Sequence, residues 1–150
     1  MAQSLSRLLI HLVFSTKNRV PALTPEIRTE LHGYLAAVLR NHQCPALEVG
    51  GVTDHVHILL VLARTKTVAK VAETLKTSSS KWLKTQSGEF GGFFWQAGYG
   101  AFSVSQSEAA RVIEYIRRQE EHHKKMTFQE EYRQFLARYE VAYDEAHLWD

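Results

Sequence analysis

Hydrophobic and polar positions alternate along this chain in segments that predict both strands and helices. Residues 7–16, 46–52 and 55–62 are short and rich in Leu, Ile and Val, which favours strands, and residues 101–104 predict a fourth strand. Apolar residues at helical spacing predict one helix from Pro25 to about Asn41 and another across residues 68–84. Thr24 before Pro25 supplies an N-cap and a proline at the first helical position.

Two more helices are expected toward the C-terminus. Ser105–Glu108 and Thr127–Glu130 both match the capping box, so the first predicts a helix through about His123 and the second predicts a further helix. The order strand, helix, strand, strand, helix, strand is that of a ferredoxin-like sheet with helices on one face. We therefore expect one α+β domain over residues 1–150, a ferredoxin-like or RRM-like antiparallel sheet with two appended C-terminal helices. In this arrangement the strand at 55–62 is central.

Composition narrows the class of protein. With 150 residues, of which 45% are hydrophobic, the chain fits one soluble globular domain. Cys44 is the single cysteine, which excludes a disulfide within the chain and favours a reducing cytoplasm. The apolar runs are too short to span a membrane, and residues 7–14 lack the length and cleavage site of a signal peptide. We expect a cytoplasmic protein without membrane contact.

The net charge of +2 is small but unevenly distributed. Residues 64–84 hold six basic residues and one acid, whereas residues 140–150 hold four acids and neither Lys nor Arg. Lysines opposite an apolar stripe usually mean a solvated helix face, but they also suit the DNA backbone. The candidate DNA contacts are Lys17, Arg19, Lys66, Lys70, Lys81 and Lys84. Phe93, Phe94, Trp95 and Tyr99 could stack on bases, although core packing is their expected role.

The candidate chemistry begins with His55 and His57. Side chains alternate faces along a strand, so these two imidazoles leave the same face about 6 to 7 Å apart and can bind one ion. Histidine pairs on strands are more often structural than ligands, so the hypothesis needs support from elsewhere. Tyr115 and Gln119 provide it, because residues four apart on a helix share a face. A phenol with a pKa near ~10 is a poor nucleophile at neutral pH, and a divalent ion that polarises a phosphate oxygen would compensate.

The pattern His-hydrophobe-His on a strand, followed some sixty residues later by Tyr-x-x-x-Gln on a helix, resembles the one-tyrosine HUH transposases of the smallest bacterial insertion sequences, the IS200-like kind. The resemblance extends over most of the chain. It is carried by Val13–Arg19, Asp54–Leu60, Trp95–Ser105 and Leu148–Asp150.

This resemblance implies a transposase that cleaves and rejoins single-stranded DNA at hairpin-marked ends. Tyr115 would form a 5′-phosphotyrosine link, and His55, His57 and Gln119 would bind Mg²⁺ or Mn²⁺ as catalytic and metal residues, without a nucleotide cofactor. It also implies a homodimer associated with the bacterial nucleoid, in which the tyrosine helix of one subunit completes either its own site or that of the other.

Several alternatives stay open. His122 is a reserve third ligand, whereas the tract His122–Lys125 is also explained by the preference of cations for a helix C-terminus. A replication initiator or relaxase nickase uses the same residue types, but relaxases place the tyrosine before the histidines, and initiators carry a lysine where this chain has Arg118. A host-adopted nuclease acting on repeat hairpins would share the catalytic core. A non-catalytic ferredoxin-like nucleic-acid-binding module would need no metal, although the aromatic signature of the common RNA-binding version is missing.

Overall fold

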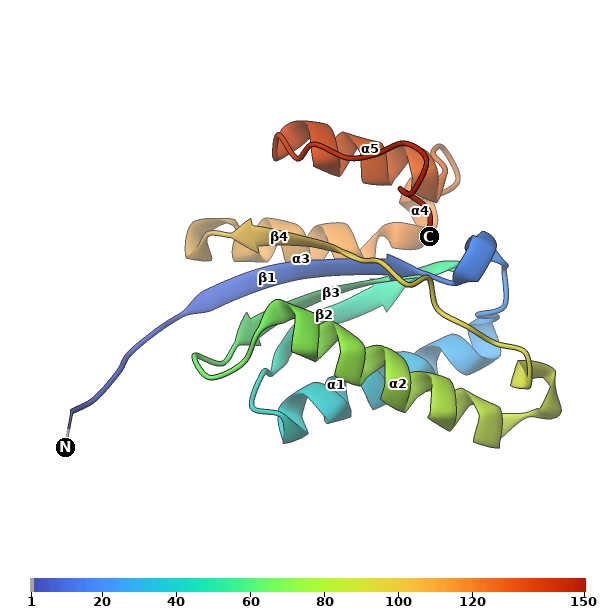
Figure 1. Cartoon of the computed structure of the whole chain (residues 1–150), viewed down its shortest axis with the longest axis horizontal. Coiled ribbons are helices and arrows are strands. Elements are labelled where there is room, and N and C mark those ends of the chain that lie inside the picture. The colour runs from blue at the N-terminus through green and yellow to red at the C-terminus, as the bar shows by residue number, and fades with distance from the viewer. Residues whose placement is uncertain (1) are drawn as a thin grey trace.

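A four-stranded antiparallel sheet forms the middle layer of the protein in a computed structural model that describes residues 2–150 (Figure 1). The strands run in the spatial order β2-β3-β1-β4, so β3 lies between β2 and β1 as expected. Their bounds are β1 Leu8–Ser15, β2 Ala46–Gly51, β3 His55–Leu62 and β4 Gly100–Val104. The predicted α+β, ferredoxin-like architecture is confirmed.

Helices cover both faces of the sheet. In Figure 1, α1 and α2 lie below the sheet, and α3, α4 and α5 lie above it. Their bounds are α1 Pro25–Asn41, α2 Val68–Gln86, α3 Ala109–Arg117, α4 Gln119–His122 and α5 Phe128–Arg138. The first pair is the one that the ferredoxin-like pattern predicts, and the second group is the appended C-terminal part. Among residues 2–150, no helix combines the length and apolarity that crossing a membrane requires.

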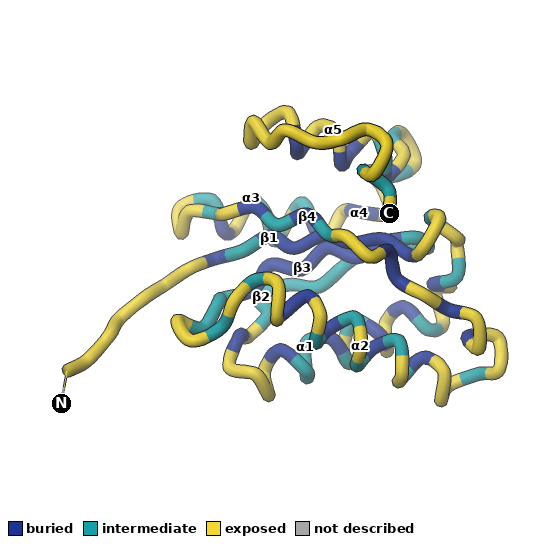
Figure 2. Tube along the Cα trace, viewed as in Figure 1, coloured by how far each residue is buried: buried dark blue, intermediate teal, exposed yellow. Residues whose placement is uncertain are grey.

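Strand alternation divides the interior into two regions. Leu12 and Phe14 of β1 and Ile58 of β3 point to the α1 and α2 side, where they join the large apolar core. Val13 and His57, which are register partners on β1 and β3, point to the opposite side. In Figure 2 the buried residues concentrate in the strands and on the sheet-facing sides of the helices. The second region, under α3 to α5, therefore holds buried polar side chains among apolar ones.

The C-terminal helices differ from the sequence prediction in two respects. The helix expected to run through His123 is divided at Arg118, whose backbone (φ −97°, ψ 19°) lies outside the helical range between α3 and α4. Ser105 makes no side-chain cap, because residues 106–108 form a 3-10 turn (η3) before α3 begins. The capping box of α5 is confirmed, since the Thr127 hydroxyl accepts a hydrogen bond from the Glu130 backbone N–H.

Gly50 allows α3 to approach β2 closely. A Cβ atom at this position would lie 2.7 Å from both the Cγ2 atom and the carbonyl oxygen of Ile116. Such a contact with backbone cannot be relieved by a side-chain rotation, so only glycine fits without moving the helix. Because Tyr115 precedes Ile116, this approach also sets the height of Tyr115 above the sheet.

Candidate metal and tyrosine site

The central strand β3 brings His55 and His57 to the sheet face that α3 to α5 cover. Both side chains are fully buried, and their ring centroids are 5.1 Å apart. The prediction that the two imidazoles leave the same face is confirmed. Burial beneath helices also means that other protein groups, rather than water, surround them.

Each imidazole has a partner on its Nδ1 atom. Asp54 Oδ1 lies 2.7 Å from Nδ1 of His55, and Nε2 of His11 lies 2.8 Å from Nδ1 of His57. Burial opposes protonation of His55, but hydrogen bonds to Asp54 and Glu131 raise its pKa to about 9. Burial lowers the pKa of His57, and burial with the neighbouring His57 lowers that of His11 to about 3. These contacts therefore favour the charged form of His55, whereas burial favours the neutral forms of His57 and His11.

The break at Arg118 determines how Tyr115 and Gln119 meet the histidines. The Tyr115 ring centroid lies 5.8 Å from that of His57, and Gln119 Oε1 lies 3.0 Å from His55 Nε2. The structure thus brings together the four residues that the sequence proposed, within a single chain. The prediction that Tyr115 and Gln119 share one continuous helix face is wrong, because Tyr115 belongs to α3 and Gln119 begins α4.

Glu131, on α5, occupies the centre of this group and was missed in the sequence. Its side chain is 1% exposed, and its Oε2 atom accepts hydrogen bonds from the Tyr115 hydroxyl and from Gln119 Nε2. Burial opposes ionisation, yet the electrostatic interaction with His57 and hydrogen bonds from His123, His55 and His57 hold the pKa of Glu131 far below its usual range. Burial and the Glu131 charge together raise the pKa of Tyr115 well above that of a free phenol. In this arrangement the tyrosine is held as a neutral hydroxyl.

His123 joins the cluster more closely than the reserve ligand His122. Nε2 of His123 lies 3.2 Å from Oε1 of Glu131, whereas Nε2 of His122 lies 3.3 Å from the Tyr115 hydroxyl and from Oε2 of Glu131. Four ligand atoms, one from each residue, lie within 4.8 Å of one another; they belong to His55, His57, His123 and Glu131. Imidazole and carboxylate donors at this spacing fit a divalent metal ion.

The sequence contains signals that could have revealed Glu131 and His11. In α5, Glu131 lies between Phe128 and Phe135 on the buried stripe, and an acid in that position needs buried partners. His11 likewise interrupts the apolar run of β1, two positions from Val13 on the same face. Titratable residues on apolar faces of different elements therefore indicate that these residues contact one another in the interior.

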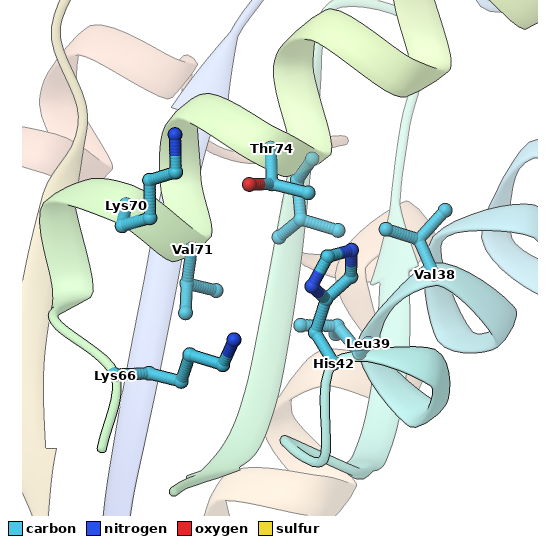
Figure 3. A pocket seen from close by; sticks show the side chains of 8 residues that line it. Val38, Leu39, His42, Lys66, Lys70, Val71 and Thr74 are labelled. Atoms are coloured by element: carbon cyan, nitrogen blue, oxygen red, sulfur yellow. The ribbon is translucent and has the colours of Figure 1, made fainter.

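Four of the predicted DNA contacts, Lys66, Lys70, Lys81 and Lys84, lie in or just before α2, on the side of the sheet away from this site. Lys66 and Lys70 border a small hollow between the end of α1 and the start of α2, together with His42 (Figure 3). Arg19 is partly engaged within the protein, since its guanidinium donates to the Trp149 carbonyl at 2.9 Å. These residues remain predicted DNA contacts.

The aromatic segment after α2 is divided between core and surface. Phe93 and Trp95 are buried, as expected, but the Phe94 side chain is 59% exposed. The ammonium groups of Lys17 and Lys84 lie 5.6 and 5.0 Å from the Phe94 ring centroid. A hollow of about 470 Å³ lies beside this ring, and Asn18 and Glu89 also line it.

The fold is shared with solved transposase structures. A protein assigned as a transposase from Deinococcus radiodurans R1 superimposes with a TM-score of 0.62 at 23% identity, covering 79% of this chain and 98% of that one. A REP-associated tyrosine transposase bound to a REP hairpin superimposes with a TM-score of 0.59 at 12% identity, covering 82% and 74% of the two chains.

Sequence comparison identifies the family. Residues 4–119 match the IS200-like transposases, and the chain belongs to that family. A curated relative, the ISDra2 transposase TnpA of Deinococcus radiodurans, is 24% identical over 114 residues, which cover 73% of this chain and 81% of the relative. The family match ends at Gln119, so His123 and Glu131 lie outside it.

Proposed function

We propose that this transposase cleaves and rejoins single-stranded DNA through Tyr115. The hydroxyl oxygen attacks the scissile phosphorus, a 5′-phosphotyrosine bond forms, and the bond to the 3′ oxygen breaks. The tyrosine proton finally resides on the released 3′-hydroxyl, and a later attack by such a hydroxyl reverses the reaction on a new end. The observation that carries this proposal is the position of Tyr115, whose ring lies beside His57 and whose hydroxyl is joined to His55 through Glu131.

His55, His57 and Gln119 are the proposed ligands of Mg²⁺ or Mn²⁺. The amide oxygen of Gln119 already faces Nε2 of His55, because its amide nitrogen donates to Glu131. The Asp54 carboxylate fixes His55 with its Nε2 atom toward the same space. When bound there, a divalent ion would polarise a phosphate oxygen and make the phosphorus more electrophilic.

The arrangement described here is a resting one. The two imidazoles are fully buried and Gln119 is 1% exposed, so a phosphate cannot touch them while Glu131 fills the space between them. Glu131 also keeps the proton on Tyr115 by raising its pKa. DNA cleavage by this site therefore requires Glu131, and with it α5, to move away from the histidines.

We infer that the DNA strand leaves the site toward Phe94. A hollow of about 610 Å³ includes Asp54, His123 and Asn18 in its lining, and Asn18 also lines the hollow beside Phe94. Bases stack on exposed aromatic rings, and phosphates pair with cations such as Lys17 and Lys84. The hairpin ends of the element, a homodimer and a place in the bacterial cytoplasm near the nucleoid are part of the same proposal.

The test is a covalent capture assay. Purified protein is incubated with Mg²⁺ and end-labelled single-stranded hairpin DNA taken from the flanks of its own gene, and a denaturation-resistant adduct is measured. We expect the adduct in the wild type and in the control Tyr143→Phe, whose ring is exposed, but not in Tyr115→Phe. Specific binding of the hairpin without an adduct in any protein would instead support a non-catalytic binding module.

A further inference from the structure

Three imidazoles and one carboxylate converge on a single point in this protein. Oε1 of Glu131 lies 3.4 Å from Nε2 of His55, 3.0 Å from Nε2 of His57 and 3.2 Å from Nε2 of His123. Two of the four residues, His123 and Glu131, lie beyond the part of the chain that matches the family. The family match therefore does not assign this set of four.

The spacing fits tetrahedral coordination. Zinc binds imidazole nitrogen at about 2.0 to 2.1 Å and carboxylate oxygen at about 2.0 to 2.2 Å, which makes the edges of the tetrahedron roughly 3.3 to 3.4 Å long. The three nitrogen to oxygen separations, 3.0 to 3.4 Å, are close to that length. The widest separation among the four ligand atoms is at most 4.8 Å, so the imidazoles need to approach by about 1.5 Å or less.

The outer partners of the three imidazoles are those of a metal site. Nδ1 of His55 contacts Asp54, Nδ1 of His57 contacts His11, and Nδ1 of His123 lies 2.7 Å from the Met126 carbonyl oxygen. Ligating histidines typically bind the metal with one nitrogen while a carboxylate, carbonyl or similar group holds the other. All three rings therefore present their second nitrogen, Nε2, to the same point, Oε1 of Glu131.

The chemistry of these donors selects the ion. Mg²⁺ prefers oxygen ligands and keeps several waters, so a set with open positions for water and phosphate suits it better than a closed one. A set of three imidazoles and one carboxylate suits Zn²⁺ or Co²⁺. Four protein ligands complete a tetrahedral ion, and such closed sites leave no position for a substrate. The proposed catalytic set uses Gln119 as its third ligand and leaves the remaining coordination positions open for phosphate or water. In the closed set His123 and Glu131 take these places.

We propose that His55, His57, His123 and Glu131 form a closed Zn²⁺ site that holds α5 against the sheet and keeps the transposase inactive. Glu131 comes from α5 and His123 from the segment just before it, so the ion would join that segment to β3. Its effect on DNA cleavage rests on the proposed function, but the binding of Zn²⁺ does not.

Binding is tested first, without DNA. Metal-free full-length protein is titrated with Co²⁺, and the visible absorption spectrum is recorded; Zn²⁺ affinity is then measured by competition with a chelating indicator. We expect the intense absorption bands of tetrahedral Co²⁺, and displacement of Co²⁺ by Zn²⁺. A weak octahedral spectrum in the wild type would overturn the proposal, whatever the variants do.

Variants identify the ligands. His123→Ala and Glu131→Gln should each lower Zn²⁺ affinity by about 100-fold or more, since even the loss of an outer partner costs about 10- to 100-fold. The matched controls are His147→Ala and Glu130→Gln, which change residues of the same types at exposed positions without contact to the four ligands and should leave the affinity within about twofold. Equal losses in the controls, or none in the two ligand variants, would contradict the assignment.

The proposed inhibition of DNA cleavage by Zn²⁺ is tested with the adduct assay. Added Zn²⁺ should suppress the Mg²⁺-dependent adduct in the wild type and much less in His123→Ala. An adduct that Zn²⁺ leaves untouched, in protein shown to bind Zn²⁺, would overturn the inhibitory role. Tetrahedral Co²⁺ binding without any adduct under Mg²⁺ would support the metal site and contradict the proposed cleavage instead.

Discussion

The Tyr115 hydroxyl donates a hydrogen bond to the carboxylate of Glu131, which in turn contacts both histidines of β3. The residue proposed as nucleophile is thus joined to the proposed metal ligands through one acid. This acid belongs to α5, so in the proposed mechanism the position of a C-terminal helix would decide whether the tyrosine and the histidines are available to DNA.

Glu131→Gln should lower the pKa of Tyr115. Burial and the negative charge of Glu131 raise that pKa, so removing the charge should bring it down by about one unit or more. The measurement is a pH titration of the tyrosine Cζ resonances in ¹³C-labelled, metal-free protein. Glu130→Gln removes an equal charge from the exposed side of α5 and should leave Tyr115 unchanged. An unaltered Tyr115 resonance in Glu131→Gln would show that the two residues are not coupled.

Gln119→Glu should slow DNA cleavage and change the metal preference. A neutral amide ligand does not weaken the attraction between the metal ion and an anionic phosphate. A carboxylate ligand adds negative charge and weakens this attraction. The structure adds a second reason, because Gln119 Nε2 donates to Glu131 and a carboxylate there would face another buried carboxylate. Adduct formation is compared in Mg²⁺ and Mn²⁺, with Gln134→Glu, on the exposed side of α5, as a control outside the site. Cleavage of a hairpin at the normal rate by Gln119→Glu would contradict this role.

The metal-free protein should lose stability between pH 6.5 and 8. The pKa of His55 is raised from 6.5 to about 9 on folding, so its contribution is complete below pH 6.5 and disappears as the pH rises through about 9. The loss over this window is on the order of 1 to 2 kcal/mol. Urea unfolding with a chelator present measures it. Asp54→Asn should flatten the dependence, and Glu73→Gln should not; an equally steep loss in Asp54→Asn would exclude His55 as the cause.

Phe94→Ala should weaken the binding of single-stranded DNA by roughly 5- to 150-fold, which corresponds to the ~1 to 3 kcal/mol of one base stacked on an aromatic ring. Changing Lys17 and Lys84 together to alanine should reduce the slope of log affinity against log salt by about 1.4. Fluorescence anisotropy at several salt concentrations measures both. Lys70→Ala and Lys81→Ala, on the same helix as Lys84, are the matched comparison. A larger loss in that pair would place the DNA path along the other lysines of α2 rather than beside Phe94.

The architecture could be predicted from the sequence because the strands, the helices and their order follow from local patterns. The alternation in residues 55–62 placed His55 and His57 on one face of a central strand, and the structure has them there. The division of α3 from α4 at Arg118 could not be foreseen, since no Gly or Pro marks it.

Long-range packing explains what the sequence did not reveal about the site. Glu131 is 74 residues from His57 along the chain, and their contact depends on how α5 folds back over the sheet. The acid on the apolar stripe of α5 was a visible sign of a buried partner, but not of which partner. The lysines of α2 show the same limit, because helix periodicity gives a basic face without saying which side of the sheet it covers.

The proposed covalent bond between Tyr115 and DNA can be tested directly by mass spectrometry. Protein incubated with Mg²⁺ and hairpin DNA is digested with protease and nuclease, and the nucleotide-bearing peptide is sequenced. We expect a 5′-linked nucleotide on Tyr115. A nucleotide attached to any other residue, or a cleaved strand with no covalently modified peptide, would contradict it.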